Sequence, residues 1–162
     1  MKLLVFADSH TDVATMLAIT KAECPDTILH LGDHIMDGVE LKSKCDVPVY
    51  LVKGNTDKEG DDIFELFLTF ENTAVFMTHG HLFNGYEELS AKGVETGAKI
   101  VLFGHTHQPY LCFENGVWLM NPGRVGCISS KRIHPTYGII QIIHGRVRCE
   151  IIEVVYAESL QQ

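Results

Sequence analysis

The chain has 162 residues, of which 46% are hydrophobic and 21% charged, and its formal net charge at pH 7 is −8. This composition excludes a disordered chain, and the acidic balance argues against an extended nucleic-acid footprint, which relies on Lys and Arg at phosphates. No stretch approaches the roughly 18 apolar residues of a membrane span. A chain of this length can bury a core of its own, so we expect one domain covering residues 1–162.

The first part of the chain alternates strand and helix signals. Residues 2–7 form an apolar run of strand length, and residues 11–23 carry apolar side chains at helical spacing after a cap at Thr11 or Asp12. Two further apolar stretches, residues 27–31 and 47–52, run into the polar loops GDH and KGNTD. Polar residues follow the opening run MKLLVF at once, so we interpret it as a strand rather than a secretory signal.

The middle of the chain continues this pattern. Residues 63–70 are ambiguous between strand and helix, and we interpret them as a strand. Residues 73–78 are a clearer strand that ends in HGH. Residues 86–96 read as a helix, helped by Glu88 and Lys92 four positions apart, and the strand-like run 99–103 leads into GHTH.

After Pro109 the pattern becomes antiparallel. Asn115-Gly116 separates two β-rich runs in residues 110–120, and a second hairpin is expected around His144-Gly145 in residues 137–155. Residues 157–162 are expected to fray. Units of strand and helix followed by hairpins indicate two packed sheets flanked by helices.

Five of the strand-like segments end in residues that can bind metal ions. These candidates are Asp8, His10, Asp33, Asn55, His79, His105 and His107. Ligands in α/β folds bind at the carboxyl ends of strands, so we expect the five loops to converge. Residues i and i+2 of an extended segment point the same way, so DSH and HTH can each present two ligands together.

This donor set suits a pair of divalent ions. Nitrogen and oxygen donors without thiolate favour Mn, Fe, Zn, Co or Ni over calcium, and Asp33 can bridge two ions. Two neighbouring ions share a water that becomes a nucleophile near neutral pH. The ions outweigh two aspartates and a shared hydroxide, and the remaining positive charge suits a phosphate ester.

Other polar residues have less specific expectations. His30 lies in a strand and His134 and His144 in turns, which favours structural or surface roles, whereas His34 and His81 adjoin candidate ligand loops. The sequence contains an odd number of cysteines and no Cys-x-x-Cys pair: Cys24, Cys45, Cys112, Cys127 and Cys149. Free thiols in a cytoplasmic protein are expected, rather than disulfides or a thiolate zinc site.

The ordered blocks DSH, GD, GNTD, THGH and GHTH, followed by NPGR, span residues 8 to 124. Together they resemble the calcineurin-like metallophosphoesterases, and within them the small bacterial and archaeal phosphodiesterases of the YfcE/MJ0936-like group. The resemblance implies a four-layer α/β/β/α sandwich of two mixed sheets. It also implies a binuclear phosphodiesterase that hydrolyses a small phosphate ester by attack of a metal-bridging water or hydroxide.

The resemblance also divides the candidate ligands between two ions. One ion would be held by Asp8, His10, Asp33 and His107, and the other by Asp33, Asn55, His79 and His105. Such proteins often use Mn, and Ni, Co, Fe or Zn also fit. Relatives often form dimers or higher oligomers, so a homo-oligomer is compatible with the sequence.

Two positions depart from the family pattern. Larger relatives have Gly-Asn-His where this chain has Thr56, which leaves the general acid open; we expect His81 to bind the phosphoryl group or donate a proton. Arg124 stands where the family block carries Ser. A surface Arg is the expectation there, and an anion contact to the substrate is the alternative.

Three rival functions are open to tests. A non-catalytic scaffold resembling the retromer subunit Vps29 would share the fold but has no need of every ligand. A metallo-β-lactamase-like enzyme would resemble His-x-His-x-Asp-His, and HGHLFN lacks two of those members. A nuclease of the same superfamily would need a strand-binding channel, which the acidic balance disfavours.

Overall fold

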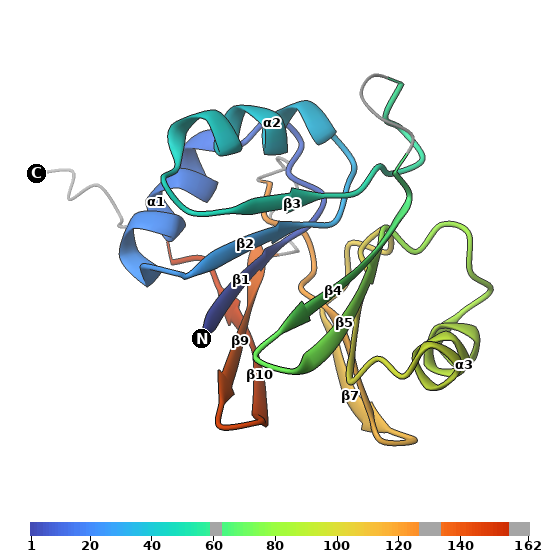
Figure 1. Cartoon of the computed structure of the whole chain (residues 1–162). Coiled ribbons are helices and arrows are strands. Elements are labelled where there is room, and N and C mark those ends of the chain that lie inside the picture. Colours follow the sequence, from blue (N-terminus) through green and yellow to red (C-terminus); the bar gives the residue numbers. More distant parts are fainter. Residues whose placement is uncertain (59–62, 127–133, 156–162) are drawn as a thin grey trace, which may run out of the picture.

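The computed structural model describes residues 1–58, 63–126 and 134–155, and all structural statements below refer to these residues. They form two five-stranded sheets that pack face to face (Figure 1). The strands of the first sheet, in spatial order, are β10 (Arg146–Glu153), β9 (Thr136–Ile143), β1 (Lys2–Phe6), β2 (Thr27–His30) and β3 (Val49–Leu51). The second sheet has the order β4 (Glu65–Phe70), β5 (Thr73–Thr78), β6 (Ile100–Leu102), β8 (Val117–Asn121) and β7 (Tyr110–Glu114).

Both sheets are mixed. Strands β1, β2 and β3 run parallel to one another, whereas β9 pairs antiparallel with β1 and β10. In the second sheet β5, β6 and β8 are parallel, and β4 and β7 are antiparallel edge strands. The parallel strands within each sheet therefore deliver their carboxyl ends to one edge of that sheet.

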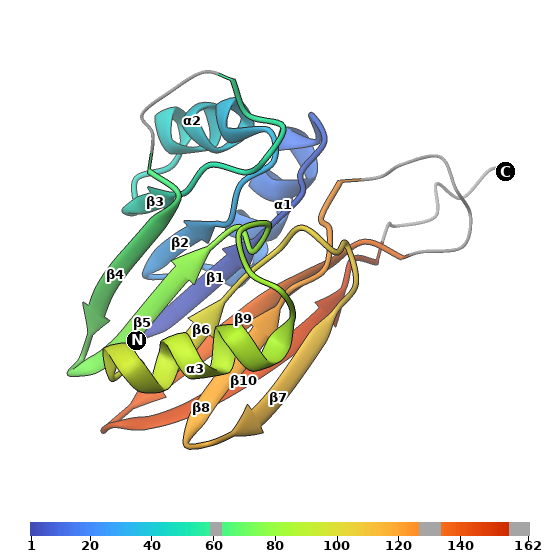
Figure 2. The same cartoon turned by 90° about the vertical axis from the view of Figure 1, so that its right-hand side faces the viewer.

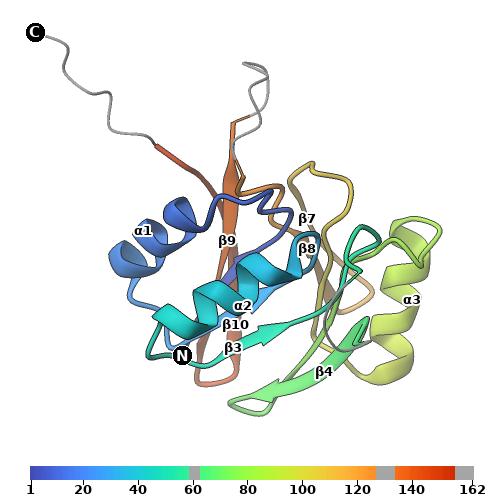
Figure 3. The same ribbon diagram turned by 90° about the horizontal axis from the view of Figure 1, so that it is seen from above.

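Three helices complete four layers. Helices α1 (Val13–Glu23) and α2 (Ile35–Lys44) cover the outer face of the first sheet (Figures 1 and 3), and α3 (Tyr86–Thr96) crosses the outer face of the second (Figure 2). The expected α/β/β/α sandwich of two mixed sheets is confirmed. None of the helices in the described residues has the length and apolar character needed to cross a membrane.

The apolar residues of β1 show how the layers are specified. Leu3 and Val5 point into the core between the sheets, and Leu4 and Phe6 point to the opposite face, under α1 and α2. All four are fully buried. A strand covered on both faces reads as a continuous apolar run, because alternate side chains enter different cores.

Helix α2 is the element that the sequence pattern did not reveal. It begins directly after His34, which adopts a left-handed conformation and makes no side-chain cap, and it carries Gly38 in its interior. A Cβ at Gly38 would lie 2.6 Å from Cδ2 of Leu51 and 3.2 Å from the ring of His30. Gly38 therefore lowers helix propensity but permits close packing on β2 and β3.

The other expected elements are present. The helix after β1 is capped by Asp12, whose carboxylate accepts from the amide of Thr15 at 3.1 Å. The ambiguous segment 63–70 contains the strand β4, and both late hairpins form as expected. The thiols of Cys24, Cys45, Cys112 and Cys149 are free. Cys127 and the tail expected to fray lie outside the described residues.

Candidate metal centre

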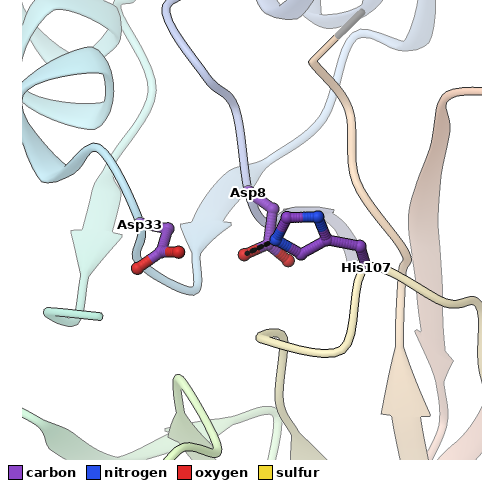
Figure 4. Close-up of side chains that lie close together, drawn as sticks. All are labelled: Asp8, Asp33 and His107. Carbon is purple, nitrogen blue, oxygen red and sulfur yellow. Dashed lines mark ion pairs between the residues drawn. The ribbon is translucent and has the colours of Figure 1, made fainter. Parts of the chain in front are cut away.

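The loops that follow β1, β2 and β6 meet at one end of the two sheets. Figure 4 shows the carboxylates of Asp8 and Asp33 and the imidazole of His107 together, each from a different loop. One potential ligand atom from each of these residues lies within 4.8 Å of the others. The expected convergence of strand-end loops therefore holds for these three candidates.

A first group of side chains gathers around Asp8. Nε2 of His107 lies 3.5 Å from Oδ1 of Asp8, and the rings of His10 and His107 are 4.9 Å apart. The ring of His34 follows, 5.1 Å from that of His10. Asp8, His10 and His107 thus form the same trio that the family resemblance assigns to one ion together with Asp33.

A second group gathers around Asp33. Nε2 of His79 lies 3.3 Å from Oδ1 of Asp33, and the rings of His79 and His105 are 5.3 Å apart. Because Asp33 also lies near Asp8 and His107, it stands between the two groups. That is the position a bridging carboxylate requires.

Several polar atoms of the cluster lack hydrogen-bond partners. Both carboxylate oxygens of Asp8, Nε2 of His10 and Nε2 of His79 are buried and form no hydrogen bond. Buried polar atoms are otherwise almost always hydrogen-bonded, and leaving one unpaired costs about 1–3 kcal/mol. Unpaired carboxylate oxygens facing imidazole nitrogens fit divalent cations, so the residues present match the metal ions that the sequence predicts.

Hydrogen bonding fixes the tautomer of His79. Its Nδ1 lies 2.7 Å from the carbonyl oxygen of Leu31, which can only accept, so Nδ1 carries the proton and Nε2 keeps its lone pair. Burial lowers the pKa of His79 to about 4, so the ring is neutral near pH 7. A neutral imidazole oriented by a backbone carbonyl is the form that binds metal ions.

Burial also perturbs the carboxylates. Burial first, and then the neighbouring Asp33, raise the pKa of Asp8 to about 8. Burial acts in the same direction on Asp33, but His79 and the two hydrogen bonds from Thr56 outweigh it and lower the pKa of Asp33. The pKa values of the two aspartates are therefore shifted in opposite directions.

The local backbone is not extended, and the argument from an extended i, i+2 pair is wrong here. Asp8, His10, His105 and His107 all have positive φ angles, of 52°, 45°, 68° and 57°. Asp33 shares this conformation, with φ 49°. Asn, Asp and His tolerate the left-handed region better than most residues, but each such residue is strained. The ligand loops after β1, β2 and β6 are therefore turns rather than extended ends of strands.

A buried network holds the loop after β1. Oγ of Ser9 and the amide of Thr11 both donate to Oδ2 of Asp37, each at 2.7 Å. The amide of Gly32 donates to Nδ1 of His30 at 3.3 Å, so Nε2 of His30 carries the proton that points to Oγ of Ser9, 3.2 Å away. His30 is fully buried and its role is structural, as expected.

The block GNTD holds Asp33 through Thr56. The hydroxyl of Thr56 donates to Oδ1 of Asp33 at 2.9 Å, and its amide does so at 3.3 Å. Asp57 accepts from the amides of Gly54 and Ile35, at 2.9 and 2.8 Å, and so joins this turn to the start of α2. Asn55, between Gly54 and Thr56 in the sequence, is exposed. Its side chain has no hydrogen bond to another described residue.

His81 adjoins the second group. Its ring lies 5.4 Å from that of His79 and 6.2 Å from that of His105. Its Nδ1 is buried without a hydrogen-bond partner. Burial, followed by the neighbouring His105, lowers the pKa of His81.

Arg124 is not the surface residue that was expected. Arg124 is the last residue of the block NPGR, and only 4% of it is exposed. The backbone amide of the next residue, Val125, donates to the carbonyl oxygen of Ala7 at 3.1 Å. This bond brings the segment against the loop that carries Asp8. Sequence periodicity could not show this, because the contact joins residues more than a hundred positions apart.

Comparison with known proteins places these loops in a family context. Residues 1–145 match the family model of the calcineurin-like phosphoesterase superfamily domain. A probable metallophosphoesterase of Bacillus subtilis, YsnB, is 32% identical over 148 residues, which cover 88% of this chain and 85% of that protein. The phosphodiesterase MJ0936 of Methanocaldococcus jannaschii is 23% identical over 172 residues, with 94% and 100% coverage.

Two solved structures show the same fold. A predicted phosphoesterase from Streptococcus pneumoniae superimposes with a TM-score of 0.74 at 24% identity, over 94% of this chain and 88% of that one. Wild-type Vps29 of Entamoeba histolytica, solved in complex with zinc, also gives a TM-score of 0.74 at 20% identity, over 94% and 99%. The fold is thus shared by a predicted enzyme and by a Vps29.

Proposed function

Because the chain belongs to the calcineurin-like phosphoesterase superfamily, we propose that it is a divalent-metal-dependent phosphodiesterase that hydrolyses a small phosphate ester at the strand-end cluster. The observation that carries this proposal is the set of buried ligand atoms without hydrogen-bond partners, on Asp8, His10 and His79. A protein that only needed a stable core would gain by pairing these atoms.

The ligand set we propose keeps all seven candidates. Asp8, His10 and His107 serve one ion and His79, Asn55 and His105 the other, with Asp33 shared. Support comes from the two groups of ring contacts and from the place of Asp33 between them. Asn55 rests on the family resemblance and on its neighbour Thr56, which binds Asp33.

Bound divalent ions would supply the water nucleophile and neutralise charge on the phosphoryl group. The chain itself contributes orientation: Leu31 aligns His79, and Thr56 aligns Asp33. We propose that His81 contacts the phosphoryl group or passes a proton to the leaving oxygen. Its support is its unpaired Nδ1 beside His79 and His105.

We propose Mn as the working ion and a binuclear centre. The donors are oxygen and imidazole nitrogen, which also accept Ni, Co, Fe or Zn. We also propose a cytoplasmic location, which the free thiols of the described cysteines support. We further propose that residues 1–162 act as one domain, because one apolar core joins residues of both sheets.

A scaffold function is the second candidate. The Vps29 and the predicted phosphoesterase superimpose on this chain with the same TM-score, 0.74. That Vps29 was solved with zinc, so metal binding alone does not separate a scaffold from an enzyme. Turnover is the property that distinguishes them.

The deciding experiment measures hydrolysis of a generic aryl phosphodiester with Mn, Ni, Co, Zn, Fe or no metal. The variants are His105→Asn and His144→Asn. Both histidines are exposed and have positive φ, 68° and 50°, but His144 lies in the turn between β9 and β10. Asn tolerates that conformation, so the pair is matched in backbone and chemistry.

We expect metal-dependent turnover that His105→Asn reduces at least about 100-fold and His144→Asn leaves intact. Absence of turnover with every metal would favour the scaffold. Cleavage of single-stranded DNA or RNA in preference to the aryl diester would favour the nuclease.

A further inference from the structure

Arg124 is a buried cation for which the described part of the chain offers no partner. It is 4% exposed, and its Nε and Nη2 form no hydrogen bond. No carboxylate of the described residues forms an ion pair with its guanidinium. A buried, unpaired charge destabilises a fold by several kcal/mol, so the position calls for an anion that none of the described residues provides.

The backbone of this segment is firmly held. The carbonyl oxygen of Arg124 accepts from the amide of Thr136 at 2.8 Å. Its neighbours Val125 and Gly126 donate to the carbonyl oxygens of Ala7 and Asp8, at 3.1 and 3.4 Å. Arg124 is therefore fixed beside the loop that carries Asp8 and His10, at the end of the sheets where the candidate ligands gather.

The charge of Arg124 acts on the first ligand group. Burial is the largest influence on the pKa of Asp8 and of His107, and the guanidinium adds a smaller one that lowers both. Yet the guanidinium does not bind Asp8, whose two oxygens stay unpaired. The cation is thus near the cluster but leaves the carboxylate free to serve as a ligand.

We propose that Arg124 binds a non-bridging oxygen of the substrate phosphoryl group and that it favours a doubly charged over a singly charged group. Guanidinium presents a planar fork of donors that matches phosphate oxygens. A third cation beside the proposed ions attracts a monoester dianion more strongly than a diester monoanion. The inference rests on the proposed function, because it assigns the residue to the same phosphoryl group.

Binding of inorganic phosphate to the Mn-loaded protein tests the contact without turnover. Arg124→Met keeps the apolar stem and removes the charge, and Arg124→Lys keeps the charge but not the fork. Arg148→Met is the control, because the side chain of Arg148 is 70% exposed and pairs with Glu150. Calorimetry at about pH 8, where phosphate is mostly doubly charged, should show affinity about 10- to 100-fold weaker in Arg124→Met.

We expect Arg124→Lys to fall between wild type and Arg124→Met, and Arg148→Met to match wild type. Metal content by mass spectrometry and the melting temperature, measured on the same samples, separate loss of anion binding from loss of metal or fold. Unchanged phosphate affinity in Arg124→Met would overturn the proposal. So would a loss of affinity that merely follows a loss of bound metal.

Turnover supplies the test of charge preference. The ratio of kcat/KM for an aryl monoester to that for the matching diester should fall at least about 5-fold in Arg124→Met. An equal effect on both esters would refute the preference. If no ester is hydrolysed by wild type but phosphate binding still depends on Arg124, the proposed function fails and the anion contact stands.

Discussion

Nε2 of His107 lies 3.5 Å from Oδ1 of Asp8, and neither atom of the Asp8 carboxylate accepts a hydrogen bond. The pair is close enough for attraction but not arranged for a bond between the two side chains. Asp8 is fully buried, and burial together with Asp33 raises its pKa to about 8. Asp8 is therefore poorly accommodated in the metal-free protein.

Replacement of Asp8 by Asn should stabilise the metal-free protein while weakening the binding of the one ion that Asp8 is proposed to hold. The amide removes a buried carboxylate that gains charge as the pH rises toward 8, so the unfolding free energy in EDTA at about pH 8 should increase by about 1–3 kcal/mol. Urea unfolding measures this change. The rise in melting temperature that Mn causes should be smaller than in wild type, and a variant destabilised in EDTA would contradict the reasoning.

Removal of the Thr56 hydroxyl should weaken metal binding, because Thr56 hydrogen-bonds the candidate ligand Asp33. Thr56→Val loses the 2.9 Å bond to Oδ1 of Asp33, which helps to lower the pKa of that carboxyl. Proton competition at Asp33 then increases, so the pH at which half the Mn binds should move upward and the Mn affinity should fall about 2- to 5-fold. Thr56→Ser keeps the hydroxyl and should restore both values.

Asp37 should act as a positioning residue for the loop after β1. It accepts from Ser9 and from the amide of Thr11 and is 8% exposed. Asp37→Ala leaves both donors unpaired, which should lower the unfolding free energy by about 1–3 kcal/mol and the Mn affinity about 10-fold. Asp37→Asn retains an acceptor oxygen. Asp37→Asn should therefore recover most of the Mn affinity, as measured by calorimetry. If it does not, the role of Asp37 is not to position the loop after β1.

His30 should make the metal-free protein sensitive to acid. Burial lowers its pKa from 6.5 to about 4, so between these values the unfolded chain binds a proton that the folded chain does not. The unfolding free energy therefore rises with pH across this window. As the pH falls through the window, the stability that neutral His30 contributes is lost. His79, whose pKa is also about 4, adds a second proton of the same sign, and Asp8 acts in the opposite direction.

The contribution of His30 can be isolated with His30→Gln. The slope of unfolding free energy against pH between about 4 and 6.5 should decrease by up to about 1.4 kcal/mol per pH unit relative to wild type. The same substitution at exposed His144 should leave the slope unchanged. A parallel shift of the whole curve, with its slope kept, would mean that His30 does not titrate in this window.

Local patterns sufficed for most of the elements and for the loops that carry the cluster. Continuous apolar runs predicted the buried strands, and the pairs Asn115-Gly116 and His144-Gly145 predicted the hairpins. These signals are encoded within a few residues. The positions of the candidate ligands could be inferred because parallel strands end at one edge. Their grouping came from the family resemblance rather than from spacing.

What failed depended on contacts between distant parts of the chain. Helix α2 carries Gly38, which lowers helix propensity but allows the helix to pack closely on His30 and Leu51. Asp8, His10 and Asp33 have positive φ, and the loops that carry them are held by Asp37 and Thr56, which lie more than 20 positions away in the sequence. The burial of Arg124 likewise requires the segment after β8 to meet the loop after β1. None of these contacts leaves a periodic trace in the sequence.

The candidate ligands come from both sheets: Asp8 and Asp33 follow strands of the first, and His79 and His107 follow strands of the second. The two proposed ions, joined through Asp33, would link two layers that otherwise meet through side chains such as Val5 and Met77. Binding of one such ion to the folded state alone stabilises that state by about 2.7 kcal/mol when the free ion is at 100 times its dissociation constant. Core substitutions that are silent in a metal-replete cell would then cause unfolding in a starved one, so the mutational tolerance of this protein would follow its metal supply.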